Sequence, residues 1–123
     1  MDKNLKVKHG ILCRMEGNLF GYLAWPSIAR FDNGILTAAC SGFRLGHLCP
    51  FGKTTLFYSF DNGDSWSPPM VVNDTPLDDR DAGLVSIGGK RLLLSWFNLD
   101  IKYYKENFSK YMKENMPPDE YRM

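Results

Sequence analysis

The chain has 123 residues, which is enough for one modest domain. Hydrophobic residues make up 44% and charged residues 24%, the proportions of an ordinary globular protein. A formal net charge of +1 gives no electrostatic reason to expect nucleic acid or an anionic membrane surface as a partner. No apolar run is long enough to span a bilayer, and residues 1–10 lack the apolar stretch of a secretion signal.

The three cysteines favour a reducing compartment. Cys13, Cys40 and Cys49 are odd in number and include no Cys-x-x-Cys pair. We therefore expect free thiols and a cytoplasmic location. The spacing of Cys40, His47 and Cys49 fits no standard zinc pattern, so we predict no metal site.

Short runs of apolar and β-branched residues, separated by turn residues, indicate a series of strands. The first five runs lie at 7–14, 25–31, 35–41, 53–58 and 70–72. The first run lies in a lead-in segment, 1–21, and Asp32-Asn33-Gly34 predicts a hairpin turn between the second and third runs. The last four runs give four short antiparallel strands across 25–72, which is the plan of one propeller blade.

The same strand-turn-strand pattern then begins again. Residues 82–87 and 91–97 predict two strands, and Gly88-Gly89 predicts the two-residue turn between them. A repeat of roughly 50 to 60 residues is typical of a propeller or a similar array. The second copy stops after its second strand.

Beyond Leu99 the apolar period changes from two residues to about 3.6. Tyr104, Phe108, Tyr111 and Met112 fall on one side of a helix, with charged residues between them. The segment 98–123 is therefore predicted to be a helical insertion or tail, with an amphipathic helix that ends before Pro117.

The most specific pattern is Ser-x-Asp-x-Gly-x-x-Trp at residues 59–66. Asp61 and Gly63 suit a tight turn, because an Asp side chain can bond the backbone and glycine accepts a positive φ. Trp66 can fold back under this turn and cover it. A calcium loop is not expected, because Gly63 and Val72 stand where an EF-hand requires acidic ligands. The segment resembles the Asp-box of the sialidase-like (BNR-repeat) β-propellers.

The resemblance covers about residues 22–97 and implies an incomplete propeller, mainly β, of about one and a half antiparallel blades. The first blade would span about 25–72 and the start of the second about 82–97. It implies a segment of a sialidase-like exo-glycosidase, a glycoside hydrolase that acts on sialic acid or a related glycan without a cofactor. Because one and a half blades cannot close a ring, we expect no activity from the chain alone. The implied partners are a glycan and either the remaining blades or other copies of the chain. The alternative is a non-catalytic propeller module that binds a glycan or a protein.

Two segments are candidates for the binding face. The first, residues 41–53, contains Arg44, whose guanidinium can bind a substrate carboxylate, and His47, which can act as an acid or a base near neutral pH. The alternatives are an ordinary salt-bridged arginine and a histidine that only forms hydrogen bonds within its loop. Cys49 beside His47 is a weaker candidate for a nucleophile.

The second candidate segment, residues 75–83, contains four consecutive charged residues, and we expect it to be a loop that leads into the second blade. Crowded carboxylates can keep one group protonated and another ionised, as glycoside hydrolysis requires. We therefore assign Asp79 and Asp81 as catalytic candidates, with Arg80 and Asp78 as candidates for substrate binding. The alternative is a solvated loop in which Asp81 caps the strand entry and Arg80 neutralises its neighbours.

The resemblance also carries residue roles. Sialidases hold the substrate carboxylate with three arginines, and Arg44 matches the Gly-Arg that follows the second strand of that family. The first arginine of the family stands just before the Ile-Pro of the first inner strand, where this chain has Trp25 before Pro26. No carboxylate lies in residues 46–53, where the acid/base aspartate would follow, so this role falls to His47 or to the cluster at 78–81.

Overall fold

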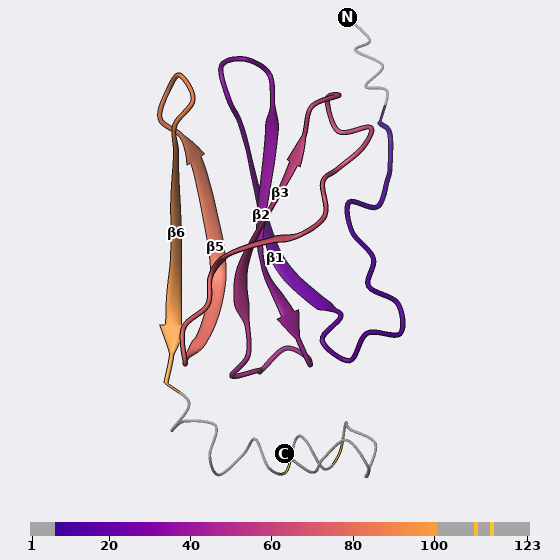
Figure 1. The fold of residues 1–123 in the computed structure, drawn as a ribbon, viewed down its shortest axis with the longest axis vertical. Coiled ribbons are helices and arrows are strands. Elements are labelled where there is room, and N and C mark those ends of the chain that lie inside the picture. The colour runs from indigo at the N-terminus through magenta and orange to yellow at the C-terminus, as the bar shows by residue number, and fades with distance from the viewer. Residues whose placement is uncertain (1–6, 101–109, 111–113, 115–123) are drawn as a thin grey trace, which may run out of the picture.

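The computed structural model describes residues 7–100, Lys110 and Glu114. Within these residues, six strands form two antiparallel sheets (Figure 1). The strands are β1 (Tyr22–Arg30), β2 (Leu36–Arg44), β3 (Lys53–Ser59), β4 (Met70–Asn73), β5 (Asp78–Ser86) and β6 (Leu92–Leu99). The mainly β, antiparallel fold class is confirmed. Within the described residues, no helix is long and apolar enough to cross a membrane.

The first sheet is a simple meander in the order β1-β2-β3-β4. Its second strand, β2, is central, and its residues from Thr37 to Gly42 are all buried. These residues are small, so side chains from other parts of the chain can pack closely on both faces of the strand. The strand β2 pairs with β3 without interruption from Leu36 to Gly42, whereas its pairing with β1 is regular from Leu36 to Ala39 and shifts register beyond Ala39.

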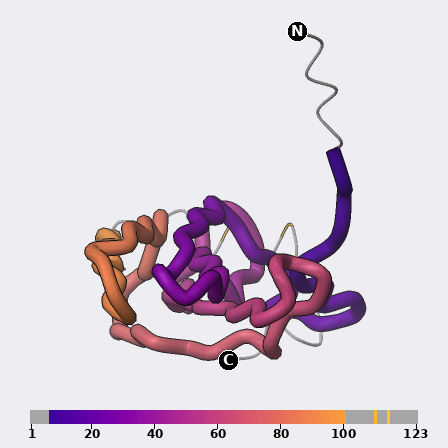
Figure 2. The backbone as a smooth tube through the Cα atoms, turned by 90° about the horizontal axis from the view of Figure 1, so that it is seen from above, coloured from indigo at the N-terminus to yellow at the C-terminus, as the bar shows by residue number. Residues whose placement is uncertain are grey.

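The two faces of this sheet bury different partners. On one face, Ala38, Cys40 and Phe57 form a core cluster, against which Leu12, Cys13, Leu23 and Trp66 pack. On the other face, Ala39 and Leu56 pack with Ala82 of β5, and Tyr58, Leu84 and Leu94 surround them. This second cluster joins the two sheets, which lie side by side in Figures 1 and 2.

The second sheet is the hairpin of β5 and β6, as the repeated pattern predicts. Its turn contains Gly88 and Gly89, both at positive φ. The strand β5 begins at Asp78, four residues before the expected start, so the charged cluster 78–81 lies inside the strand and the expectation of a loop is wrong. Asp78 and Asp79 pair with Leu99 and Asn98 of β6, and their side chains have partners that make burial possible.

The N-terminal segment also differs from the expectation. Residues 7–21, all of which are described, contain no strand, so the expected strand at 7–14 is wrong. Instead, the side chains of Leu12 and Cys13 cover one face of the first sheet, and Lys8 forms an ion pair with Asp64. The expected C-terminal helix lies outside the described residues, apart from Lys110 and Glu114.

The turn between β3 and β4 is organised by Asp61. Its Oδ1 accepts hydrogen bonds from the Ser59 hydroxyl and the Ser65 backbone N–H, both at 2.8 Å, and its Oδ2 accepts one from the Ser65 hydroxyl. Ser59 Oγ in turn accepts a bond of 2.8 Å from the Gly63 N–H. Asn62 and Gly63 have φ values of +62° and +95°, which explains the preference for glycine here. Trp66 is half-buried against the Ala38, Cys40 and Phe57 cluster, so the predicted tryptophan-covered turn is confirmed.

Replacing Asp61 by asparagine tests this network. The hydrogen bonds from Ser65 and Ser59 lower the pKa of Asp61 from 3.8 to about 2. Because the folded pKa is the lower one, ionised Asp61 stabilises the turn above about pH 4, and this contribution is lost as the pH falls toward 2. We expect Asp61→Asn to lower the melting temperature by several degrees at pH 7, and the difference from wild type to shrink between pH 4 and pH 2.

The matched control is Asp64→Asn, since the Asp64 side chain forms an exposed ion pair with Lys8 and, within the described residues, does not bond to the turn. We expect this variant to melt close to wild type. Equal melting temperatures for Asp61→Asn and wild type across this pH range would contradict the role given to Asp61.

Candidate functional site

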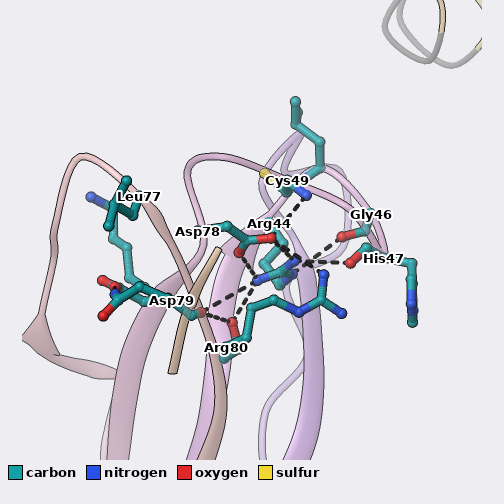
Figure 3. Close-up of polar contacts among 12 residues, drawn as sticks. Arg44, Gly46, His47, Cys49, Leu77, Asp78, Asp79 and Arg80 are labelled. Carbon is teal, nitrogen blue, oxygen red and sulfur yellow. Dashed lines mark hydrogen bonds and ion pairs between the residues drawn. The ribbon is translucent and has the colours of Figure 1, made fainter. Parts of the chain in front are cut away.

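A buried ion pair between the end of β2 and the start of β5 joins the two sheets (Figure 3). Arg44, the last residue of β2, donates from Nη1 to Asp78 Oδ1 at 2.6 Å and from Nη2 to Asp78 Oδ2 at 3.0 Å. Asp78 is the first residue of β5, and both side chains are completely buried. This two-pronged contact is the geometry in which a guanidinium binds a carboxylate most strongly.

The other donors of Arg44 bind protein groups as well. Nε donates to the Gly46 carbonyl at 3.2 Å, Nη2 to the His47 carbonyl at 2.9 Å, and Nη1 to Ser41 Oγ at 2.7 Å. Together with the two bonds to Asp78, these contacts provide an acceptor for each of the five N–H groups of the guanidinium. In this arrangement Arg44 fixes the loop that follows β2. Its assignment to a substrate carboxylate stays a prediction.

Gly52 lies directly against this ion pair. A Cβ atom built on Gly52 would be 2.1 Å from Arg44 Nη1 and 2.5 Å from Asp78 Oδ1. The backbone of Gly52 is also used, because its carbonyl accepts a bond of 3.1 Å from the Asp79 N–H. Only glycine therefore fits between the loop and the ion pair.

Asp79 points away from Arg44, as Figure 3 shows. Its side chain accepts hydrogen bonds from the Thr75 N–H at 2.9 Å, the Thr75 hydroxyl at 2.7 Å and the Asn98 side-chain amide. The residue is fully buried, so this carboxylate orders the segment before β5. Asp81, by contrast, is exposed and has a φ of +49° at the register shift between Arg80 and Gly83. The structure thus does not bring the carboxylates of Asp79 and Asp81 together with Arg44.

Arg80 and Arg44 both lie over the indole ring of Trp25. The guanidinium carbon is 4.5 Å from the ring centroid for Arg80 and 4.9 Å for Arg44. The His47 ring meets the same indole edge-on, at 5.1 Å between centroids. Trp25 was not among the site residues predicted from the sequence. Its only signal there is its place before Pro26, where the resembled family has an arginine.

Charge and exposure define the outer surface of this cluster. Asp78 is shared by two guanidiniums, because Arg80 Nη1 also approaches Asp78 Oδ2 at 3.4 Å. Arg44 and Arg80 thus bring two positive charges beside the carboxylate of Asp78. The arginines are buried, Trp25 is half-buried and His47 is exposed, so a molecule arriving from solvent meets His47 and Trp25 first.

Cys49 does not have the surroundings of a nucleophile. Its thiol is buried and accepts a hydrogen bond from the Leu45 N–H at 3.3 Å. Burial raises the pKa of this thiol, which therefore stays protonated near neutral pH. Among residues 7–100, Lys110 and Glu114, no group of three or more histidine, cysteine, aspartate or glutamate side chains could hold a metal ion.

Comparison with known proteins does not assign the chain to a family. No protein-family model matches the chain, and no curated protein matches it. The resemblance to sialidase-like propellers therefore rests on the sequence pattern and remains a prediction.

Replacing Gly52 by alanine tests how tightly the ion pair is enclosed. The added methyl group must displace a guanidinium and a carboxylate that are both fixed by several bonds. We expect a loss of at least about 2 kcal/mol in the free energy of unfolding, the range for overpacking and for damage to a buried charged network. Urea titration followed by circular dichroism measures this loss.

Gly10→Ala is the control for this substitution. A Cβ on Gly10 meets nothing within 4 Å, so the free energy of unfolding of this variant should lie within about 0.5 kcal/mol of the wild-type value. If Gly52→Ala were as stable as Gly10→Ala, the close packing of Gly52 on the ion pair would be wrong.

Proposed function

We propose that the chain is a glycan-directed segment of a sialidase-like β-propeller, with the first sheet as one blade and the β5–β6 hairpin as the start of the next. On this proposal its site binds an acidic sugar, such as sialic acid, and the chain alone does not hydrolyse it. The observation that carries the proposal is the gathering of Arg44, Arg80 and Trp25 around Asp78 at one end of both sheets.

The arrangement of the strands supports the blade assignment. A blade is a four-stranded antiparallel meander, and the order β1-β2-β3-β4 has this form. The Asp61 turn stands between its last two strands, where the resemblance expects an Asp-box. The second sheet packs on a face of the first through Ala39, Leu56 and Ala82, as neighbouring blades do.

The outer face of the second sheet supports the need for partners. Leu84 and Leu94 are paired across the β5–β6 ladder and pack toward the first sheet. The next pair, Val85 and Leu93, points the other way, and these residues are 51% and 58% exposed. Repeat units bury such faces against neighbours, so the proposed partners are the remaining blades or other copies of the chain.

The position of the charged cluster supports a binding role. Leu36, at the start of β2, pairs with Ser59 beside the Asp61 turn, while Arg44 is at the other end of the strand. Nine residues of strand separate these ends by about 26 Å. The group of Arg44, Arg80, Trp25 and Asp78 therefore lies at the end of the sheet opposite the Asp61 turn, where the resemblance places the ligand.

The carboxylates favour binding over catalysis by this part of the chain. Asp78 is bound to Arg44 and Asp79 to Thr75 and Asn98, so both are engaged in holding the structure. Of the candidate site residues, His47 and Asp81 are the exposed titratable ones. This observation favours the alternative function as well, a non-catalytic propeller module that binds a glycan or a protein.

Binding and turnover are measured separately to test the proposal. In a ligand-detected NMR titration, we expect saturable binding of N-acetylneuraminic acid and much weaker binding of the neutral sugar N-acetylglucosamine. Arg80→Gln should weaken binding of the acid by roughly tenfold, because a charged hydrogen-bonding partner is lost. A fluorogenic sialoside should release no fluorophore.

Arg91→Gln is the matched control, since it removes the same charge from an exposed position in the turn at the far end of β5. We expect it to bind N-acetylneuraminic acid like wild type. Absence of saturable binding, or equal weakening in both arginine variants, would refute the glycan site. Release of the fluorophore would refute the expectation that the chain alone is inactive.

A further inference from the structure

Three phenylalanine side chains line one hollow in the surface of the molecule. Phe20 comes from the lead-in segment, Phe43 from β2 and Phe51 from the loop between β2 and β3, and all three are half-buried. The rings of Phe20 and Phe51 meet edge to face, with 5.9 Å between their centroids and 86° between their planes. The hollow has a volume of about 350 Å³, which lies within the range of sites that bind small molecules.

Two polar side chains complete the lining of this hollow, Lys53 and Asn18. Lys53, the first residue of β3, forms an ion pair with Asp74, and its side chain is 30% exposed. An ammonium group has three N–H donors, and in the part of the chain that the structure describes Asp74 is their one acceptor. The side-chain oxygen of Asn18 accepts a bond of 2.9 Å from the Phe20 N–H, while its amide nitrogen has no acceptor among the described residues. Both side chains can therefore donate hydrogen bonds to a ligand.

Phe43 has a backbone conformation that residues other than glycine rarely adopt. Its φ is +53°, and it lies between Ser41 and Arg44, where β2 has one residue more than the part of β1 with which it pairs. Such an extra residue is a β-bulge, which redirects side chains and is common beside functional sites. Here Phe43 lines the hollow, while the next residue, Arg44, reaches the buried ion pair. Strain of this kind persists only where the surroundings impose it, and it is concentrated at functional sites.

We propose that this hollow is a binding site for a small aromatic carboxylic acid. The ring of the ligand lies among the three phenylalanine rings, which favour edge-to-face or offset contacts with a further ring. Its carboxylate accepts a charge-assisted hydrogen bond from the Lys53 ammonium and a second bond from the Asn18 amide. The site thus favours ligands that carry both a ring and an acid. It is independent of the proposed glycan site, because none of its lining residues is assigned to the glycan.

Titrations followed by two-dimensional NMR test the site with three ligands. Phenylacetate carries a ring and a carboxylate, 2-phenylethanol keeps the ring without the charge, and acetate keeps the charge without the ring. We expect phenylacetate to shift the backbone amide signals of Phe43 and Lys53 saturably, with a Kd on the order of 1 mM, as suits so small a ligand. At equal ionic strength the other two should bind at least about fivefold more weakly. The proposal is overturned if phenylacetate gives no saturable shift, or if either of the others binds as tightly.

Two opposite substitutions test the charge beside the hollow. Lys53→Gln removes the cation and should weaken the binding of phenylacetate roughly fivefold. Asp74→Asn removes the carboxylate that competes for the same ammonium and should strengthen this binding roughly twofold. Lys90→Gln is the control for a lost charge, since Lys90 lies exposed in the turn between β5 and β6, and this variant should bind like wild type. Unchanged binding in Lys53→Gln, or equal weakening in Lys90→Gln, would contradict the proposal.

A further pair of variants tests the aromatic wall. Phe20→Leu keeps an apolar side chain but removes the ring that meets Phe51, and it should weaken the binding of phenylacetate roughly threefold. Phe60→Leu is its control, because Phe60 is 78% exposed beside the Asp61 turn. Equal weakening in these two variants would overturn the site. If Phe20→Leu does not fold, as its melting curve would show, the partly exposed Lys53→Gln still decides the question.

One variant separates this inference from the proposed function. Arg80→Gln should weaken the binding of N-acetylneuraminic acid and leave the binding of phenylacetate unchanged, since Arg80 does not line the hollow. The glycan proposal can therefore fail while the aromatic acid site stands, and the reverse also holds. A loss of phenylacetate binding in Arg80→Gln equal to that in Lys53→Gln would refute the assignment of the ligand to this hollow.

Discussion

The interaction on which the site depends is the buried ion pair between Arg44 and Asp78. It joins the last residue of β2 to the first residue of β5, and so it connects the two sheets. Removing two ions from water costs several kcal/mol for each, and their attraction offsets this cost only when the geometry is good and the remaining hydrogen-bonding groups are satisfied. Here the contact is two-pronged, and Ser41, Gly46 and His47 accept the other bonds of the guanidinium.

This requirement shapes the surrounding chain. The loop after β2 turns its carbonyl groups toward Arg44, and Gly52 leaves room for both charged groups. Because both oxygens of Asp78 are taken by Arg44, Arg80 is held to Asp78 by a longer contact and lies over Trp25. Two guanidiniums therefore share one carboxylate at this end of the sheets.

Much of the fold follows from local sequence signals. The runs of apolar and β-branched residues predict β1, β2, β3, β4 and β6 to within a few residues, and the pattern at 59–66 predicts its turn because every bond of that turn is made within about eight residues. The start of β5 could not be predicted in this way. Aspartate is uncommon in strands, and Asp78 and Asp79 are accommodated here by Arg44 and Asn98, partners that are distant in the sequence. The apolar residues near Leu12 suggest a strand but cover a sheet face instead.

The sequence predicts which residues belong to the site better than it predicts how they are arranged. Charge and position in the two candidate segments identify four of the site residues from the sequence: Arg44, His47, Asp78 and Arg80. The structure brings these four residues together at one end of the sheets. The pairing of Arg44 with Asp78 spans 34 positions and leaves no periodic trace in the sequence. Trp25 was not predicted as a site residue, because neither its positive φ nor its contact with two arginines distant in the sequence leaves a residue pattern.

A double-mutant cycle on Arg44 and Asp78 tests the central claim most directly. The single variants Arg44→Met and Asp78→Leu each leave one buried charge without its partner, and each should lower the free energy of unfolding by about 3–5 kcal/mol. The double variant should cost less than the sum of the two by at least about 2 kcal/mol, because each single variant loses the same Arg44–Asp78 pair and the double variant loses it only once. Additive losses, within about 0.5 kcal/mol, would show that the two residues do not act as a pair and would contradict the account.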